Sequence, residues 1–153
     1  MQTLNNITQK GEQWVQIPDF PNYLVSNAGR VYSGNDNNIL KGEWSEKEYH
    51  YVRLYSDKCR NGKKIKVSHL VAMVFCDRFK NGMEVHHINC NNADDRAVNL
   101  LPVTKLEHIL IHVLYRHIFK HPNLIVELFK RKKPNIHITV NIDNDNMNGG
   151  AAA

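Results

Sequence analysis

The chain has 153 residues and a formal net charge of +5 at neutral pH, with a sequence pI near 9.1. This length provides one domain with a modest core, and the basic excess suits a polyanionic partner such as nucleic acid, although many ordinary proteins carry a similar charge. No apolar run approaches the roughly 18 residues that span a membrane, and the N-terminus is too polar for a signal peptide, so we expect no membrane partner. The three cysteines, Cys59, Cys76 and Cys90, are widely spaced without a CxxC pair. This spacing indicates reduced thiols and a cytoplasmic protein, not a disulfide frame or a cysteine zinc site.

The first third of the chain predicts small antiparallel hairpins. Residues 1–13 are polar and are expected to form a flexible N-terminus, and a β-rich module follows over residues 14–66. A strand is predicted over residues 14–17, because Pro18 and Pro21 then force an extended turn. Residues 23–25 and 30–32 flank the sequence Ser-Asn-Ala-Gly, which is typical of a hairpin turn.

Further strands are predicted over residues 39–40, 49–55 and 64–67, with a turn over residues 60–63. Basic side chains gather in this part of the chain. They fit either a solvated sheet edge guarded by lysine or a ribbon that follows DNA phosphates. Arg30, in the preceding hairpin, fits either a phosphate contact or a solvated turn. The basic residues that we expect to contact DNA are Arg30, Arg53, Lys58, Arg60, Lys63, Lys64 and Arg96.

Residues 67–121 are expected to form a second unit. A helix is predicted over residues 68–79, a strand over residues 83–88 and an Asn/Asp-rich loop over residues 89–96. Thr104 and Glu107 form a T-x-x-E capping box that predicts a helix from Lys105 onwards. On this helix we expect a buried apolar stripe and, on the opposite side, a polar and aromatic face. The stripe comprises Leu106, Leu110, Val113 and Leu114, and the opposite face comprises His108, His112, Tyr115 and Phe119.

Four histidines make the most specific pattern in the chain. His108 and His112 are four residues apart, so both imidazoles lie on one face of a helix and can reach one metal ion. His86 and His87 are adjacent at the end of a strand, where neighbouring side chains point to opposite faces. One of these two is therefore expected to bind the metal, and the other to face a substrate.

The sequence VHHINCNNADDRAVNLLPVTKLEH, which contains these residues, resembles the HNH endonucleases of the ββα-metal (His-Me finger) superfamily. The earlier sequence WVQIPDFPNYLVSNAGRVYS resembles the short module that precedes the HNH unit in phage and intron-encoded homing endonucleases. The two motifs occur in the order found in that family. The resemblance implies an α+β fold, with small N-terminal antiparallel hairpins, a ββα-metal unit over residues 67–121 and C-terminal helices.

The resemblance also implies roles for individual residues. His87 corresponds to the histidine that acts as general base, and Asn99 to the asparagine that braces the loop of the ββα unit. His86, His108 and His112 are then the metal ligands. We expect a backbone carbonyl or the Asn99 side chain to set the tautomer of His87. The loop acids Asp94 and Asp95 are interpreted as loop residues, since such side chains do not usually hold the metal in the family.

The implied function is that of a metal-dependent endonuclease that hydrolyses DNA phosphodiester bonds. The protein would be a homing or a phage-encoded enzyme, and would either nick DNA or cut both strands. Three nitrogen ligands favour zinc, manganese, nickel or cobalt over magnesium, whereas relatives with Asp or Asn at the His86 position commonly use magnesium, which stays possible. The alternatives are a DNA-binding protein that keeps the fold without cleaving, and a domain with a structural zinc ion. The sequence leaves open whether the protein is a monomer or a homodimer.

The C-terminal part is expected to contain a further helix over residues 123–132 and one edge strand over residues 136–142. The Asn/Gly/Ala-rich tail of residues 143–153 is expected to be disordered. The C-terminal segment between the second unit and this tail comprises residues 122–142. No helix-turn-helix pattern is evident in it.

Overall fold

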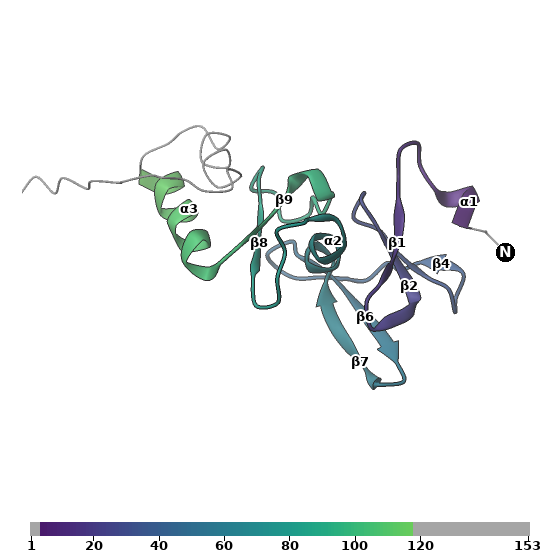
Figure 1. Cartoon of the computed structure of the whole chain (residues 1–153). Coiled ribbons are helices and arrows are strands. Elements are labelled where there is room, and N and C mark those ends of the chain that lie inside the picture. The colour runs from purple at the N-terminus through teal and green to yellow at the C-terminus, as the bar shows by residue number, and fades with distance from the viewer. Residues whose placement is uncertain (1–3, 118–153) are drawn as a thin grey trace, which may run out of the picture.

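The computed structural model describes residues 4–117. They form an α+β fold, as predicted, in which three antiparallel sheets surround helix α2 (Val67–Phe75). Figure 1 shows the N-terminal strands on one side of α2, and strands β8 and β9 with helix α3 on the other. Among the described helices, none is long and apolar enough to cross a membrane.

The N-terminal sheet is a meander of four strands: β1 (Trp14–Ile17), β2 (Phe20–Ser26), β3 (Val31–Ser33) and β4 (Asn38–Ile39). The predicted hairpin is confirmed, because β2 and β3 pair antiparallel with Val25 opposite Val31. Tyr23 and Val25 on β2 are buried, whereas Asn22 is exposed and Leu24 half-buried, so one face of the strand enters the core.

The part of residues 1–13 that the structure describes contains a one-turn helix, α1 (Leu4–Ile7). Arg30 connects the N-terminal segment to the sheet: its guanidinium donates to the Ile7 carbonyl at 2.7 Å and forms an ion pair with Glu12. Burial opposes the charged form of Glu12, but hydrogen bonds from Arg30 and Gln9 hold the pKa of its carboxyl below the usual value. Arg30 is therefore directed into the protein by these bonds.

The second sheet consists of β5 (Glu43–Trp44), β6 (His50–Ser56) and β7 (Cys59–Lys66). The turn between β6 and β7 lies at residues 57–58, so the turn predicted over residues 60–63 is wrong. Gly62 lies within β7, with a φ of +73°, where the register between the strands shifts. A bulge therefore accounts for the Asn-Gly signal, and a Cβ at Gly62 would come within 2.6 Å of the Tyr55 ring.

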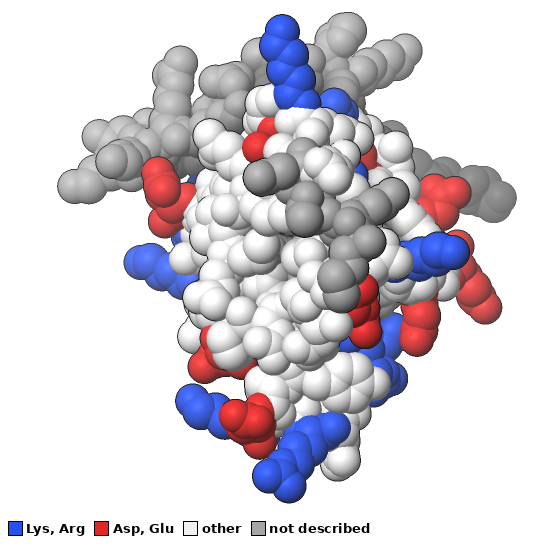
Figure 2. All heavy atoms as spheres, turned by 90° about the vertical axis from the view of Figure 1, so that its right-hand side faces the viewer, with Lys and Arg blue, Asp and Glu red and all other residues white. Residues whose placement is uncertain are grey.

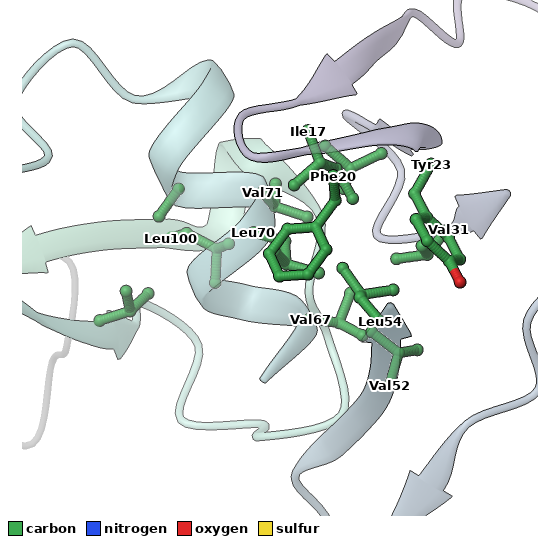
Figure 3. Close-up of a cluster of buried hydrophobic side chains, with 13 residues drawn as sticks. Ile17, Phe20, Tyr23, Val31, Val52, Leu54, Val67, Leu70, Val71 and Leu100 are labelled. Atoms are coloured by element: carbon green, nitrogen blue, oxygen red, sulfur yellow. The ribbon is translucent and has the colours of Figure 1, made fainter. Parts of the chain in front are cut away.

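The main hydrophobic core lies where α2 meets both larger sheets (Figure 3). Leu70 and Val71 of α2 are no more than 1% exposed. They pack in one cluster with side chains from the N-terminal sheet, β6 and β9. Ten of these core residues are labelled in Figure 3: Ile17, Phe20, Tyr23, Val31, Val52, Leu54, Val67, Leu70, Val71 and Leu100.

Strands β8 (Glu84–His87) and β9 (Leu100–Val103) pair antiparallel and are joined by a loop that ends in a 3₁₀ turn at Ala97–Asn99. The two faces of this hairpin have different partners. Val85 and Leu100 join the main core around α2. Leu101 and Val103 pack with Ile111 of helix α3 (Lys105–His117) in a second, smaller core.

Helix α3 begins at the predicted capping box. The Glu107 amide donates to Thr104 Oγ1 at 3.2 Å, and the Thr104 amide donates to Glu107 Oε2 at 2.7 Å.

The predicted buried stripe on α3 is wrong. Leu106 is 67% exposed, whereas Ile111, which was not assigned to the stripe, is fully buried. Leu110 and Val113 are also exposed, and of the predicted stripe only Leu114 packs against the second core. The helix instead packs on the second core with Ile111, Leu114 and Tyr115. His108, which is half-buried, and His112, which is exposed, lie on the side of the helix that meets His86 of β8.

The predictions for the C-terminal part fall outside the described residues. These are the helix over residues 123–132, the strand over residues 136–142, the tail of residues 143–153, and the placement of Phe119.

Candidate active site

Three predicted ligands, His86, His108 and His112, come together. One ring nitrogen of each lies within 4.8 Å of the corresponding atoms of the other two. Nε2 of His108 is 3.1 Å from Nε2 of His112. Two nitrogens bound to one tetrahedral zinc ion at about 2.0–2.1 Å would lie roughly 3.3 Å apart. The donor set and its spacing therefore suit a divalent transition metal.

His86 supplies independent evidence that this cluster can hold a cation. The residue is 2% exposed, and its buried Nε2 atom has no hydrogen-bond partner among the described residues. A buried polar atom without a partner is unfavourable unless a ligand satisfies it. Burial first, and then the positive charges that His108 and His112 can carry, lower the pKa of His86 to about 4. The imidazole is thus neutral near pH 7, which is the form that binds metals.

Glu84 orients one of the ligands. Its Oε2 is 2.5 Å from Nδ1 of His108, so Nδ1 donates to the carboxylate and Nε2 is left for a metal. This hydrogen bond with His108 holds the pKa of Glu84 below its usual value. The sequence prediction missed Glu84, although strand alternation places it on the same face of β8 as His86.

His87 points to the other side of β8 and bonds to an acid of the loop. Its Nε2 lies 3.0 Å from Oδ1 of Asp95, and the two side chains are 3% and 5% exposed. The predicted partner of His87, a backbone carbonyl or the Asn99 side chain, is therefore wrong. An ionised carboxylate only accepts hydrogen bonds, so it favours the tautomer with the proton on Nε2. Nδ1 is then the ring nitrogen that can accept a proton from water.

Asn99 connects the two ends of the loop between β8 and β9. Its Oδ1 accepts from the Asn89 amide at 3.0 Å, and its Nδ2 donates to the Asp94 carbonyl at 2.8 Å and to Asn89 Oδ1 at 3.0 Å. Asn99 is 6% exposed. These bonds fix the loop that carries Asp95 relative to the strand that carries the histidine pair.

All four histidines line one cavity of about 180 Å³. His87 reaches this cavity, although it points to the other side of β8 from His86, because it is the last residue of the strand. Tyr49 also lines this cavity, with its ring centroid 6.1 Å from that of His87. The ammonium of Lys66 lies 3.9 Å from the centroid of the Tyr49 ring and brings positive charge close to the cavity. A larger hollow of about 550 Å³, bordered by Asp19, Tyr55 and Lys58 among others, contains none of these histidines.

The basic residues predicted to contact DNA do not form one cluster. Arg53 and Lys64 face each other across β6 and β7, and Lys64 forms an ion pair with Glu43 at 2.5 Å. Arg96 binds both carboxylate oxygens of Asp94. On the face seen in Figure 2, basic and acidic side chains are mixed, including at the lower end, where Figure 1 places the tip of the β6–β7 hairpin. Lys63 and Arg60 are exposed on β7, and Lys58 is exposed in the turn that precedes it.

Comparison with known proteins finds one family motif and several similar endonucleases. Residues 12–55 match the family model of the NUMOD4 motif. The DNA endonuclease I-HmuI of Bacillus phage SP01 is 34% identical over 94 residues, which are 61% of this chain and 53% of that protein. The H-N-H endonuclease F-TflII of Escherichia phage T5 is 32% identical over 103 residues, which are 65% of this chain and 51% of that protein.

A solved structure described as DNA binding and cleavage by the HNH homing endonuclease I-HmuI is similar in fold, with a TM-score of 0.63 and 27% sequence identity. The match covers 76% of this chain and 66% of that one, and the chain spans about half the length of the two phage relatives. The NUMOD4 motif, the similar sequences and the shared fold agree with the geometry of the histidine site. In sequence and in fold the chain is similar to the phage-type HNH endonucleases.

Proposed function

We propose that this chain is a metal-dependent endonuclease that hydrolyses DNA phosphodiester bonds, with His87 as the general base. The observation that carries the proposal is that two groups of side chains line the same cavity. A cluster of three histidine nitrogens within 4.8 Å of one another lies beside a fourth histidine, which is held by a buried carboxylate. The DNA endonucleases among its relatives support DNA as the substrate.

The residues of the chain divide the work as follows. His87 accepts a proton from the attacking water at Nδ1, because Asp95 engages Nε2. His86, His108 and His112 hold one divalent ion, and Glu84 keeps His108 in the tautomer that presents Nε2. A bound divalent ion supplies charge stabilisation to the phosphate and to the leaving 3′-oxygen. Asn99 keeps the loop in place, so that base and ligands hold a fixed relation.

We infer that the ion is a transition metal. Imidazole nitrogen suits zinc, nickel, cobalt and manganese, whereas magnesium prefers oxygen ligands in an octahedral arrangement. The three proposed ligands of this chain are all nitrogens, and the neighbouring carboxylate of Glu84 is bonded to the ring of His108.

The DNA surface that we propose comprises the cavity mouth and the outward face of β6 and β7. Lys66 lies beside the cavity wall, and Arg53 and Lys64 continue along the same face of the sheet, because residues paired across antiparallel strands share a face. Arg30 is not included, because it is bonded to Glu12 and Ile7. These contacts would bind phosphates and provide affinity that falls as salt rises.

The test is to assay supercoiled plasmid with magnesium, manganese, nickel and zinc, using wild type, His87→Ala and His86→Ala. Removing a general base slows a reaction by about 10²–10⁴-fold. His87→Ala should therefore retain metal and DNA affinity while cutting slowly, and His86→Ala should lose metal and activity together. The ratio of nicked to linear product shows whether one strand or both are cut. The opposite pattern in the two variants would exchange their roles, and full activity of His87→Ala would exclude the mechanism.

A further inference from the structure

The turn of the N-terminal hairpin lies directly on the loop of the nuclease unit. The Asn27 carbonyl, between β2 and β3, accepts a hydrogen bond from the amide of Ala97 at 2.9 Å. Two residues further on, Gly29 approaches the backbone of Asp95. The NUMOD4 motif, which includes this turn, thus contacts the segment that holds the acid bonded to His87.

The contact at Gly29 is too close for a side chain to enter without a shift of Asp95 by a few tenths of an ångström. A Cβ built on Gly29 would lie 3.0 Å from both the carbonyl carbon and the Cβ of Asp95, and 3.1 Å from its carbonyl oxygen. These are main-chain atoms and the first side-chain atom, so they cannot move aside by a change of rotamer. The φ of Gly29 is +80°, which other residues rarely adopt. Both the space and the conformation therefore favour glycine.

The turn is itself rigidly held. The Asn27 side chain accepts from the Gln13 amide at 3.0 Å and donates to the Gly11 carbonyl at 3.3 Å. The Gly29 amide donates to the Ser26 carbonyl at 3.1 Å, and the Ser26 hydroxyl accepts from the Arg30 amide at 3.1 Å. A turn fixed by several bonds can fix what it touches, whereas a mobile turn cannot.

Asp95, whose backbone Gly29 contacts, also forms a hydrogen bond with His87 through its carboxylate. Both side chains are almost fully buried, and the Oδ1–Nε2 distance is 3.0 Å. The chain of contacts is continuous: the turn at Gly29 meets the Asp95 backbone, the Asp95 carboxylate meets Nε2, and the ring presents Nδ1. A shift of the Asp95 backbone changes the position of the carboxylate, and with it the orientation of the imidazole.

We infer that the N-terminal module is part of the catalytic centre, with Gly29 and Asp95 as positioning residues for His87. The inference rests on the proposed role of His87 as general base. The module adds to phosphodiester cleavage by holding Asp95 where its carboxylate accepts from Nε2. This role is separate from any contact that the module makes with DNA. The inference predicts that a substitution in the hairpin turn lowers the rate of cleavage more than the affinity for DNA.

Asp95→Asn and Gly29→Ala test the two links of this chain, and Gly11→Ala is the matched control. Gly11 directly precedes the module and has a φ of +79°, but a Cβ there would meet nothing within 4 Å, and alanine keeps the carbonyl that accepts from Asn27. The control therefore carries the same backbone strain without the contact to Asp95. Asp95→Asn is nearly the same size as the native residue, and it serves as the second variant if Gly29→Ala lowers stability too far.

Three measurements are made on each protein: the single-turnover cleavage rate, the affinity for DNA and for zinc, and the ¹⁵N chemical shifts of the His87 ring at about pH 8. The shifts report which ring nitrogen carries the proton when imidazole is neutral. Wild type and Gly11→Ala should show the proton on Nε2. An asparagine can present either oxygen or NH₂ to Nε2, so Asp95→Asn should show a mixture of the two tautomers.

We expect Gly29→Ala and Asp95→Asn to cleave on the order of 10²-fold more slowly than Gly11→Ala, with affinities for DNA and zinc within about twofold of the control. Equal rates for Gly29→Ala and Gly11→Ala, or unchanged ring shifts in both test variants, would overturn the inference. A loss of DNA affinity equal to the loss of rate would also overturn it, because the turn would then serve binding. If wild type itself does not cleave DNA, the proposed function fails, while the ring shifts still decide whether the turn positions His87.

Discussion

The two hydrophobic clusters of this protein differ in size, and the four histidines of the candidate site are divided between them. The main cluster unites the N-terminal sheet, β6, β7, α2 and one face of β8–β9, and contains thirteen buried residues. The second cluster attaches α3 to the other face of β8–β9 with three buried residues: Leu101, Val103 and Ile111. His87 and Asp95 lie on the side of the large cluster, whereas His108 and His112, two of the three proposed metal ligands, lie on the weakly attached helix.

This difference gives the proposed metal site a structural purpose. A helix held by three buried apolar side chains gains little free energy from packing, and isolated helices of this length are marginal in water. A metal ion bound by His86 of β8 and by two histidines of α3 would connect the helix to the strand. We propose that the base is held by packing, and that the ligand helix is held in large part by the ion.

The largest effect should come from the main core. Leu70→Ala removes a fully packed side chain from α2 and should lower the free energy of unfolding by about 2–5 kcal/mol. Ile111→Ala is the matched control in the second core, since it is equally buried and loses the same number of carbon atoms.

We expect Leu70→Ala to reduce hydrogen-exchange protection of all the described elements, and Ile111→Ala to reduce it mainly in α3. Urea unfolding and hydrogen exchange of the two variants provide the measurement. Loss of protection throughout the chain in Ile111→Ala would show that the two clusters form one cooperative unit.

Metal removal should have an effect of intermediate size that is concentrated on α3. Zinc at 100 times its dissociation constant should stabilise the wild type by about 2.7 kcal/mol, provided that it binds only the folded state. A chelator should reverse this and increase exchange in α3 more than in α2. His112→Ala should abolish the response, whereas Ile109→Ala, an exposed position on the same helix, should retain it. An equal response of His112→Ala and wild type to zinc would contradict the three-histidine site.

The histidine site could be predicted from sequence because its geometry is local. The spacing of His108 and His112 specifies one helical face, and strand alternation separates His86 from His87. The alternation of Val52 and Leu54 on β6, and the capping box at Thr104, are also local patterns, and the structure contains both.

The features that were mispredicted depend on contacts over distance or on competing patterns. Helix α3 has apolar residues on several faces, so spacing alone does not show that Ile111, and not Leu106, would meet the sheet. The Asn-Gly pair at residues 61–62 is the usual signal of a hairpin turn, but the strand absorbs it as a bulge. In both cases two local solutions exist, and tertiary packing selects one.

Asp95 could not be identified because its environment is made by three separate parts of the chain. In sequence it is one of two aspartates in a loop, and such loops favour Asp and Asn for their turn geometry. Its burial results from the turn at Gly29, and its partner is His87 on β8. Asp94, its neighbour, instead binds the exposed Arg96. Adjacent, chemically identical residues thus have different roles, and only the fold distinguishes them.

The smallest of the three effects is the pH dependence of the metal-free protein, which tests how His86 is buried between the clusters. The folded chain lowers the pKa of His86 from 6.5 to about 4, chiefly through burial. The unfolded chain therefore binds a proton more readily than the folded chain between these values. Neutral His86 therefore makes its full contribution to the free energy of unfolding above pH 6.5, and this contribution is lost as the pH falls towards 4. Between pH 7 and pH 5 the loss should be about 2 kcal/mol.

His86→Leu provides the comparison, because leucine fills a similar volume and carries no titrating group. With chelator present, the free energy of unfolding is measured by urea at pH 7 and pH 5 for both proteins. Other groups titrate in both, so the difference between the two losses isolates His86. We expect wild type to lose about 2 kcal/mol more than His86→Leu over this range. Equal losses would mean that His86 reaches water in the metal-free protein, and that β8 and α3 separate there more readily than β8 separates from the main core.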